Sequence, residues 1–297
     1  MNFLMNLIEF SFLYFPLMVG GYISISLMRL PDLSIEAAYV FGAILASKTA
    51  LIFGGESLLK YLLVIFASLL GGALVGFISS SLSIFLKLPH MLSAILTIGM
   101  FQGINQIVLG CSNISLASVD LVINKIIIFQ NYPEFLVGFL IFMLLILIGF
   151  LFFKTSLGYC LVVFGINGEF FSFYNISKKY VYFVGIILSN ALAGLSGFLI
   201  VQASGFVDIG MGSGIALLCI AVILFGNFFN RFKKRVSIFV PVLGVCSYIL
   251  LQQLMMQFGF DTKYFTMLQA ILILCFLFLN LKFNEVNFKK MLNNLGF

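Results

Sequence analysis

The feature that most constrains this chain is a succession of apolar runs, each about as long as a helix that crosses a bilayer. A transmembrane helix needs about 20 predominantly apolar residues, and runs of this kind alternate here with Gly, Pro or polar interruptions. Alternating ten-residue strand patterns are missing from the sequence. The pattern predicts an all-α polytopic membrane protein with about nine transmembrane helices, within a range of roughly 8–10. The candidate spans are Leu4–Met28, Ser34–Phe53, Leu58–Leu86, Met91–Leu109, Phe135–Phe153, Val181–Gln202, Gly214–Phe229, Val236–Gln257 and Phe265–Leu281.

The composition excludes a soluble fold. The 297 residues are 62% hydrophobic and 9% charged, and the mean hydropathy is +1.19, whereas soluble domains carry about 25% charged residues. Nothing marks a second domain, so we expect residues 1–297 to form a single transmembrane domain. The first Lys or Arg is Arg29, so the basic start of a secretory signal peptide is missing.

The placement of Lys and Arg predicts the sidedness of the chain. The net charge is +6, but the basic residues lie in short loops at span ends, which argues for a topology signal and against a nucleic-acid partner. With the loop 154–180 in the cytoplasm, the positive-inside rule favours N-out, C-in. If the first run crosses twice or not at all, the N-terminus changes side and the later loops do not. The basic residues then inside are Arg29, Lys87, Lys154, Lys178, Lys179, Arg231, Lys233, Lys234, Arg235, Lys282, Lys289 and Lys290.

Two interruptions place an Asp before a polar or Gly-rich turn and a short apolar helix. In the first, Pro31 and Asp32 end one helix, Ser34 is expected to cap the next, and Glu36 lies in its first turn. On this topology Asp32 lies near the inner face and the second Asp near the outer face, which is typical of an inverted repeat beside a pathway. Two unrelated loops that contain Asp explain the pattern equally well. The second interruption holds Asp208, Gly210, Gly212 and Gly214.

Polar side chains inside the spans are candidates for a translocation pathway. Gln102, Asn105 and Gln106 share one helical face, and Asn190 and Gln202 lie in the sixth run. Such groups face either a cavity or a neighbouring helix, because a charged side chain at mid-span costs about 2.5–3.5 kcal/mol. Hydrogen bonding between helices is the alternative for each of them.

No motif indicates catalysis or internal energy coupling. GGESLLK at 54–60 lacks the order of a phosphate-binding loop, and GMGSG and AGLSGF miss the GxSxG pattern. The five cysteines share no CxxC spacing, and a lone histidine, His90, cannot build a histidine metal site. The spans hold no set of buried charges of the kind that ion-coupled carriers use. We therefore expect no enzyme activity, no cofactor and no metal, and an energy source on another chain.

Two stretches of the chain resemble permease subunits of bacterial ABC importers of the branched-chain amino acid and ribose type. The similarity is highest to the tryptophan/tyrosine-type subgroup and extends over roughly residues 15–255. It implies a multi-pass subunit of the bacterial inner membrane that imports a small solute and sits among membrane lipid. It also implies two cytoplasmic ATPase subunits, an extracytoplasmic solute-binding protein and a second permease subunit. The stretches are PDLSIEAAYVFGAILA and KTSLGYCLVVFGINGEFFSFYNISKKYVYFVGIILSNALAGLSGFLIVQASGFVDIGMGSGIALLCIAVILFG.

The same resemblance implies that the loop at about 154–180 couples the permease to the ATPase. Gly165 and Asn167 match the start of the family's loop, and Glu169 is a third match. A short helix near Gly165–Tyr174 that presents aromatic residues and one acid suits a groove on a partner. A helix lying on lipid headgroups is the alternative. The loop departs from the family at Phe170 and Phe171, where smaller residues are usual, and at Asn175 before Ile176, where a glycine is usual.

Two other functional classes compete with the importer. A self-contained secondary transporter or channel would need neither an ATPase nor a binding protein. An intramembrane enzyme is disfavoured by the missing catalytic motifs.

Overall fold

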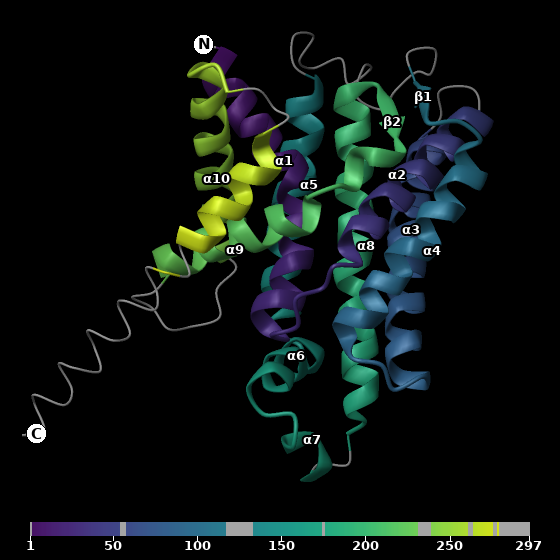
Figure 1. The fold of residues 1–297 in the computed structure, drawn as a ribbon, viewed down its shortest axis with the longest axis vertical. Coiled ribbons are helices and arrows are strands. Elements are labelled where there is room, and N and C mark those ends of the chain that lie inside the picture. Colours follow the sequence, from purple (N-terminus) through teal and green to yellow (C-terminus); the bar gives the residue numbers. More distant parts are fainter. Residues whose placement is uncertain are drawn as a thin grey trace, which may run out of the picture.

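The structure is a computed structural model that describes residues 2–53, 58–116, 133–173, 176–230, 239–260, 264–275 and 278. The described part is helical apart from a two-stranded antiparallel ribbon (Figure 1). The π-helix η1 and the 3₁₀-helix η3 interrupt the α-helices. The elements are α1 (Asn2–Gly21), η1 (Tyr22–Leu27), α2 (Ile35–Ile52), α3 (Leu58–Phe85), α4 (His90–Leu109), β1 (Asn113–Ser115), α5 (Pro133–Phe152), α6 (Ser156–Ile166), α7 (Phe170–Phe173), α8 (Lys178–Ser204), β2 (Phe206–Asp208), η3 (Ile209–Gly212), α9 (Ile215–Asn230) and α10 (Phe239–Gln257).

The predicted all-α polytopic class is confirmed, and the described residues provide seven or eight spans. Seven segments are long and apolar enough to cross a membrane, and α5 with α6 is a pair bent by 76° that counts as an eighth. The ninth predicted run contains a shorter helix, Phe265–Cys275. At about 1.5 Å per residue this helix extends about 16 Å, roughly half the hydrocarbon core.

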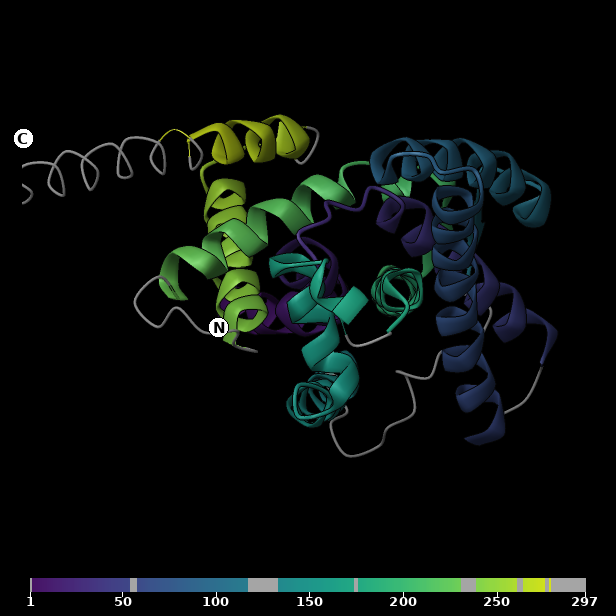
Figure 2. The same ribbon diagram turned by 90° about the horizontal axis from the view of Figure 1, so that it is seen from below.

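Helix α8 is the centre of the bundle, and α1 and α3 run antiparallel to it. The hydroxyl of Ser189 donates to the carbonyl of Gly20, and Ser196 donates to Leu13, each at 2.8 Å. Because contacts that advance along α8 recede along α1, the two helices point in opposite directions. Figure 2 shows the C-terminal helices α9 and α10 on one side of this centre and the blue helices α3 and α4 on the other.

Glycines let the helix backbones touch at several contacts between helices. An added Cβ at Gly194 of α8 would lie 2.5 Å from the Ser68 carbonyl oxygen, and one at Gly71 would lie 2.9 Å from the Cα of Gly42 in α2. Helices α2, α3 and α8 therefore pack with almost no side chain between them, as small residues permit in membrane bundles. The same holds for α9 and α10, where Gly226 and Gly244 face carbonyls of the opposite helix.

The two ends of the bundle differ in structure. At one end β1 pairs with β2, with Asn113 opposite Asp208, and so links the chain after α4 to the chain after α8. This is called the ribbon end below. At the opposite end α6 and α7 extend beyond the other helices (Figure 1), and this is called the α6–α7 end. The core lies between them, around Leu17, Ile44 and Leu199.

Candidate functional site

The first broken element lies between η1 and α2. Arg29 has a φ of +56°, a left-handed conformation that is uncommon for a residue other than glycine. Asp32 then closes a turn: its Oδ1 accepts from the backbone N–H of Ser34 at 2.9 Å and from the Ser34 hydroxyl at 2.6 Å. Ser34 is the N-cap residue of α2, as predicted, but its side chain makes no cap hydrogen bond, and its hydroxyl donates to Asp32.

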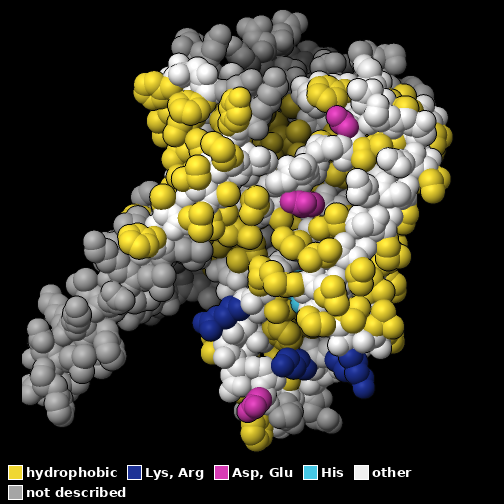
Figure 3. All heavy atoms as spheres, in the orientation of Figure 1, with side chains coloured by type: hydrophobic (Ala, Val, Ile, Leu, Met, Phe, Trp, Pro, Cys, Tyr) yellow, Lys and Arg dark blue, Asp and Glu magenta, His cyan; other side chains and the backbone are white. Residues whose placement is uncertain are grey.

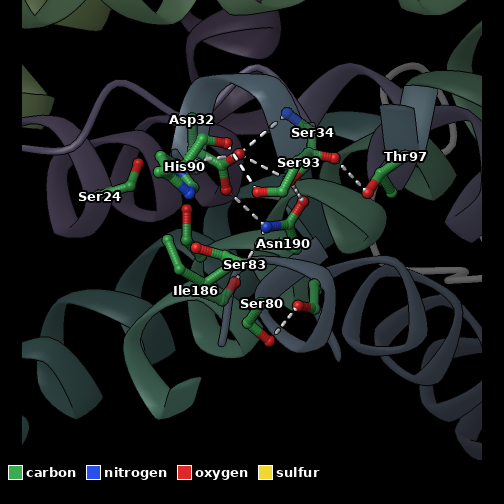
Figure 4. Close-up of polar contacts among 12 residues, drawn as sticks. Ser24, Asp32, Ser34, Ser80, Ser83, His90, Ser93, Thr97, Ile186 and Asn190 are labelled. Atoms are coloured by element: carbon green, nitrogen blue, oxygen red, sulfur yellow. Dashed lines mark hydrogen bonds and ion pairs between the residues drawn. The ribbon is translucent and has the colours of Figure 1, made fainter. Parts of the chain in front are cut away.

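The Asp32 carboxylate is the centre of a buried polar network, which Figure 4 shows. Asn190, midway along α8, donates from Nδ2 to Asp32 Oδ2 at 2.8 Å. His90 Nε2 lies 3.6 Å from Asp32 Oδ1, and His90 Nδ1 shares a hydrogen bond of 2.8 Å with the Tyr182 hydroxyl. Asp32 is 2% exposed and Asn190 is fully buried. The Asp32 network, formed by Asp32, Ser34, His90, Tyr182 and Asn190, thus joins three elements and supplies partners to both carboxylate oxygens.

The Asp32 network brings together a carboxylate and an imidazole that both lie outside the predicted spans, and the expectation that the spans hold no set of buried charges stays a prediction. Asp32 is hydrogen-bonded to Asn190 in the middle of α8, and His90 lies beside it. The sequence does not indicate that Asp32 and His90 are neighbours, because Asp32 lies between two apolar runs and His90 lies just before another. Only the fold brings them together.

The second broken element repeats the local chemistry of the first. Asp208 Oδ1 accepts from the backbone N–H of Gly210 at 2.9 Å, two residues later, as Asp32 does from Ser34. Asp208 thereby caps η3, and Gly214 follows with a φ of +83°, which glycine adopts readily. The two elements differ in depth, because Asp208 lies in β2 at the ribbon end whereas Asp32 is buried. Their sidedness across a membrane and the inverted repeat stay predictions.

Glu36 connects the two broken elements. It lies in the first turn of α2, and its Oε1 accepts from the backbone N–H groups of Gly214 and Ala216, at 3.2 and 3.3 Å. The carboxylate therefore satisfies two N–H groups at the start of α9, where the helix dipole favours negative charge. Gly212 packs against the same turn, since a Cβ there would lie 2.8 Å from the Glu36 carbonyl oxygen.

A cavity of about 360 Å³ opens where these elements meet α4. Its wall combines a carboxylate, two amides, a hydroxyl, backbone groups of η3 and a few aliphatic side chains. Gln102 is exposed whereas Asn105 is 3% exposed, so the cavity extends from the surface towards the interior. Asn105 Oδ1 has no hydrogen-bond partner among the described residues. The lining residues are Glu36, Ala37, Val40, Ile98, Gln102, Asn105, Ile209, Gly210, Gly212 and Ser213.

The five predicted pathway residues are therefore separated by the fold. Gln102 and Asn105 line the cavity, and Gln106, although exposed, does not. Asn190 belongs to the Asp32 network. Gln202 is 4% exposed near the end of α8 and does not line the cavity either. The sequence did not predict that Glu36 and η3 lie beside Gln102 and Asn105. Their proximity depends on how the two broken elements fold onto each other.

The predicted coupling loop forms two short helices, α6 and α7, after a bend of 76° between α5 and α6. Helix α6 runs from Ser156 to Ile166, and the hydroxyl of the preceding residue, Thr155, caps it by accepting from the Gly158 N–H at 3.3 Å. The expected single helix near Gly165–Tyr174 is wrong, because Asn167 breaks it: Asn167 Oδ1 accepts from the Glu169 N–H at 3.1 Å. Helix α7 then starts at Phe170.

The side chains of this region are partly buried and partly exposed. Phe171 is 1% exposed and packs in a core cluster with Leu27 of η1 and Leu161 of α6. Ile166 and Phe173 are 67% and 82% exposed, and Phe170 and Ile176 are 39% and 40% exposed. Glu169 is also exposed. Tyr174 and Asn175 lie outside the described residues.

Gly165 connects the coupling region to the first broken element. A Cβ at Gly165 would collide with the carbonyl oxygen of Leu27, the last residue of η1. A Cβ at Gly185 of α8 would meet both Met28 and Leu161 of α6. The end of η1 therefore rests directly on α6, only a few residues before Asp32.

Comparisons with known proteins agree over most of the length. A family model described as the branched-chain amino acid transport system permease component matches residues 3–277. A tyrosine transport system permease protein of Clostridioides difficile is 30% identical over 275 residues, which cover 91% of this chain and 90% of that protein. An uncharacterized protein of Rickettsia prowazekii is also 30% identical, over 269 residues, 88% of this chain and 91% of that protein. No solved structure matches the chain.

Proposed function

Because this chain belongs to the family of branched-chain amino acid transport system permease components, we propose that it is the transmembrane subunit of an ABC importer. It carries an amino acid or a related small molecule into the cytoplasm, driven by ATP hydrolysis on a separate subunit. The family and the multi-pass fold support a multi-pass membrane protein that acts as a transport subunit. For a bacterial importer this is the inner membrane.

The observation that carries the proposal is the α6–α7 element. It extends beyond the bundle and exposes Ile166 and Phe173, while Gly165 rests on η1. Exposed apolar side chains on a short rigid element suit a groove on a partner, and the backbone contact at Gly165 would pass a displacement of the element to the first broken turn. The partner proposed here is the cytoplasmic ATPase.

Charge supports the orientation that this docking needs. On the face that Figure 3 shows, Lys and Arg gather towards the α6–α7 end, and the rest of the face is largely hydrophobic. The positive-inside rule assigns such an end to the cytoplasm. The ribbon end would then face outward, towards a solute-binding protein, and a second permease subunit would complete the pathway. Tyrosine, the solute in the relative's name, is the first substrate to try.

The test is ATP-dependent uptake by the complete importer in liposomes. Uptake should require the ATPase and the binding protein, and Glu169→Lys should lower coupled ATP hydrolysis while the permease stays folded and inserted. Gly165→Pro should do the same by distorting the contact with η1. Full coupled activity in both variants would remove the α6–α7 element from the mechanism.

The Asp32–His90 pair favours a second candidate, a carrier coupled to protons. Ionisable groups inside a membrane often belong to proton relays. Liposomes that hold the permease alone separate the two functions. Uptake driven by a proton gradient without ATPase would support the carrier, whereas the importer predicts none.

A further inference from the structure

The cavity between α2, α4 and η3 is rich in hydrogen-bond acceptors. Glu36 is the charged residue of its described lining, and Gln102 and Asn105 add neutral amides. Both N–H groups that bind Glu36 from the start of α9 go to Oε1. The second carboxylate oxygen, Oε2, receives no hydrogen bond from the described residues.

Asn105 provides a second, independent sign of a ligand. Its side chain is almost fully buried, yet its Oδ1 has no hydrogen-bond partner among the described residues. A buried acceptor without a partner is costly and calls for a donor from outside the chain. Asn105 and Glu36 line the same cavity.

We propose that this cavity binds the ammonium group of the transported solute, with Glu36 Oε2 and Asn105 Oδ1 as acceptors. The inference rests on the proposed function and narrows its substrates to primary amines, amino acids among them. An ammonium carries three donors and a positive charge, which a carboxylate and a carbonyl oxygen both satisfy. The volume of about 360 Å³ lies at the lower end of small-molecule sites, which span roughly 300–1,000 Å³.

The opposite assignment, a site for the solute carboxylate, conflicts with the charges. The helix N-terminus that could attract an anion is already occupied by Glu36. A second carboxylate in the cavity would meet a like charge in a partly buried setting, which is unfavourable. The ammonium of a phosphatidylethanolamine headgroup has the same chemistry as that of a solute, so the test must separate the two sources.

The test measures binding to the full-length permease in nanodiscs of phosphatidylglycerol, a lipid without an amine. The probes are tyramine, tyrosine and 4-hydroxyphenylpropionate, together with the aliphatic series isoamylamine, leucine and 4-methylpentanoate. The amines and amino acids should bind, and the two deaminated acids should not. Glu36→Gln keeps an acceptor for α9 but turns an amide N–H₂ towards the cavity, so the affinity for amines should fall roughly tenfold or more.

A variant that binds amines more tightly cannot be explained by misfolding, so it complements the loss of affinity expected in Glu36→Gln. Gln102→Glu adds a second carboxylate at the exposed side of the cavity, so amine affinity should rise severalfold. Gln257→Glu makes the same change at the exposed end of α10, away from the cavity, and should leave binding unchanged. Equal affinities in wild type, Glu36→Gln and Gln102→Glu would overturn the amine site, as would tight binding of the deaminated acids.

Two further outcomes have defined meanings. If no probe binds in phosphatidylglycerol but phosphatidylethanolamine co-purifies with wild type and not with Glu36→Gln, the site holds a lipid headgroup and the solute assignment is wrong. Uptake by the complete importer is scored separately. If Glu36→Gln keeps the wild-type preference between amines and deaminated acids in ATP-driven uptake, the amine site is wrong and the proposed function stands. If wild type shows no ATP-driven uptake, the proposed function itself is wrong.

Discussion

Asp32 and Glu36 lie four residues apart in one broken element, yet their surroundings are opposite. The Asp32 carboxylate receives hydrogen bonds from Ser34 and Asn190, and it is 2% exposed. Glu36 receives two bonds on one oxygen and faces a cavity in which the buried amide of Asn105 has an unpaired oxygen. The hydrogen bonds of the Asp32 carboxylate are thus made within the fold. In the proposed amine site, acceptors of Glu36 and Asn105 are left for a ligand. The predictions below test this contrast between the closed network and the open cavity.

The largest effect is expected from removing the closed carboxylate. Asp32→Ala leaves the amide of Asn190 and the hydroxyl of Ser34 without their partner, and the free energy of unfolding should fall by about 3 kcal/mol. Glu36→Ala removes two peripheral bonds and should cost about 1 kcal/mol or less. Thermal unfolding in detergent, followed by size-exclusion chromatography, measures both. Equal losses would abolish the contrast.

The two asparagines form a matched pair for the next test. Asn190→Leu strands Asp32 Oδ2 in the interior and should cost about 2 kcal/mol of stability. Asn105→Leu removes an acceptor that has no partner, so its stability should change by about 0.5 kcal/mol or less, while uptake falls. Protein level, unfolding temperature and uptake are compared for both variants. A large loss of stability in Asn105→Leu would mean that its amide belongs to a dry helix contact.

Thiol labelling tests accessibility directly. In a background without the five native cysteines, Gln102→Cys and Asn105→Cys should react with a water-soluble maleimide, and a bulky reagent at either site should block uptake. Ser34→Cys lies in the closed network and should stay unreactive under the same conditions. Reaction is followed by a mass shift. If Ser34→Cys reacts as fast as Asn105→Cys, the network is open to water.

The smallest effect is expected at His90. Its Nε2 forms no hydrogen bond among the described residues, and its contact with Asp32 is long, at 3.6 Å. His90→Gln should therefore lower the free energy of unfolding by about 1 kcal/mol or less and leave ATP-driven uptake intact. Uptake that depends on His90 in a pH-dependent manner would instead favour the proton-coupled carrier.

Local sequence predicted the helices well, because the length of an apolar run is set by the bilayer and needs no knowledge of neighbours. The break at Asp32 and the break at Asp208 were predicted for the same reason: Pro31 and the glycines act on their own backbone. The side-chain role of Ser34 was not, because its hydroxyl donates to the Asp32 carboxylate and accepts no hydrogen bond from the N–H groups at the start of α2. Local propensity cannot decide between these two roles when the fold determines where the carboxylate lies.

The candidate site was predicted only in part. The spacing of Gln102 and Asn105 placed them on one face of a helix, and both line the cavity. Glu36 was recognised as part of a broken element, but its contact with the start of α9 spans most of the chain and leaves no local signal. The pairing of His90 with Asp32 has the same origin. The periodicity of apolar residues therefore predicted the helices but not the long-range contacts between short polar segments that form the site.

The glycine contacts define two sets of closely packed helices. Helices α2, α3 and α8 touch backbone to backbone at Gly42, Gly71 and Gly194, and α9 and α10 do so at Gly226 and Gly244. We expect each set to move as a unit, because sliding within a set would drive side chains into the opposite backbone. The hydrogen bonds from Glu36 to the start of α9 join the two sets. A movement that parts the sets would break these bonds and free both carboxylate oxygens of Glu36 for a cationic group.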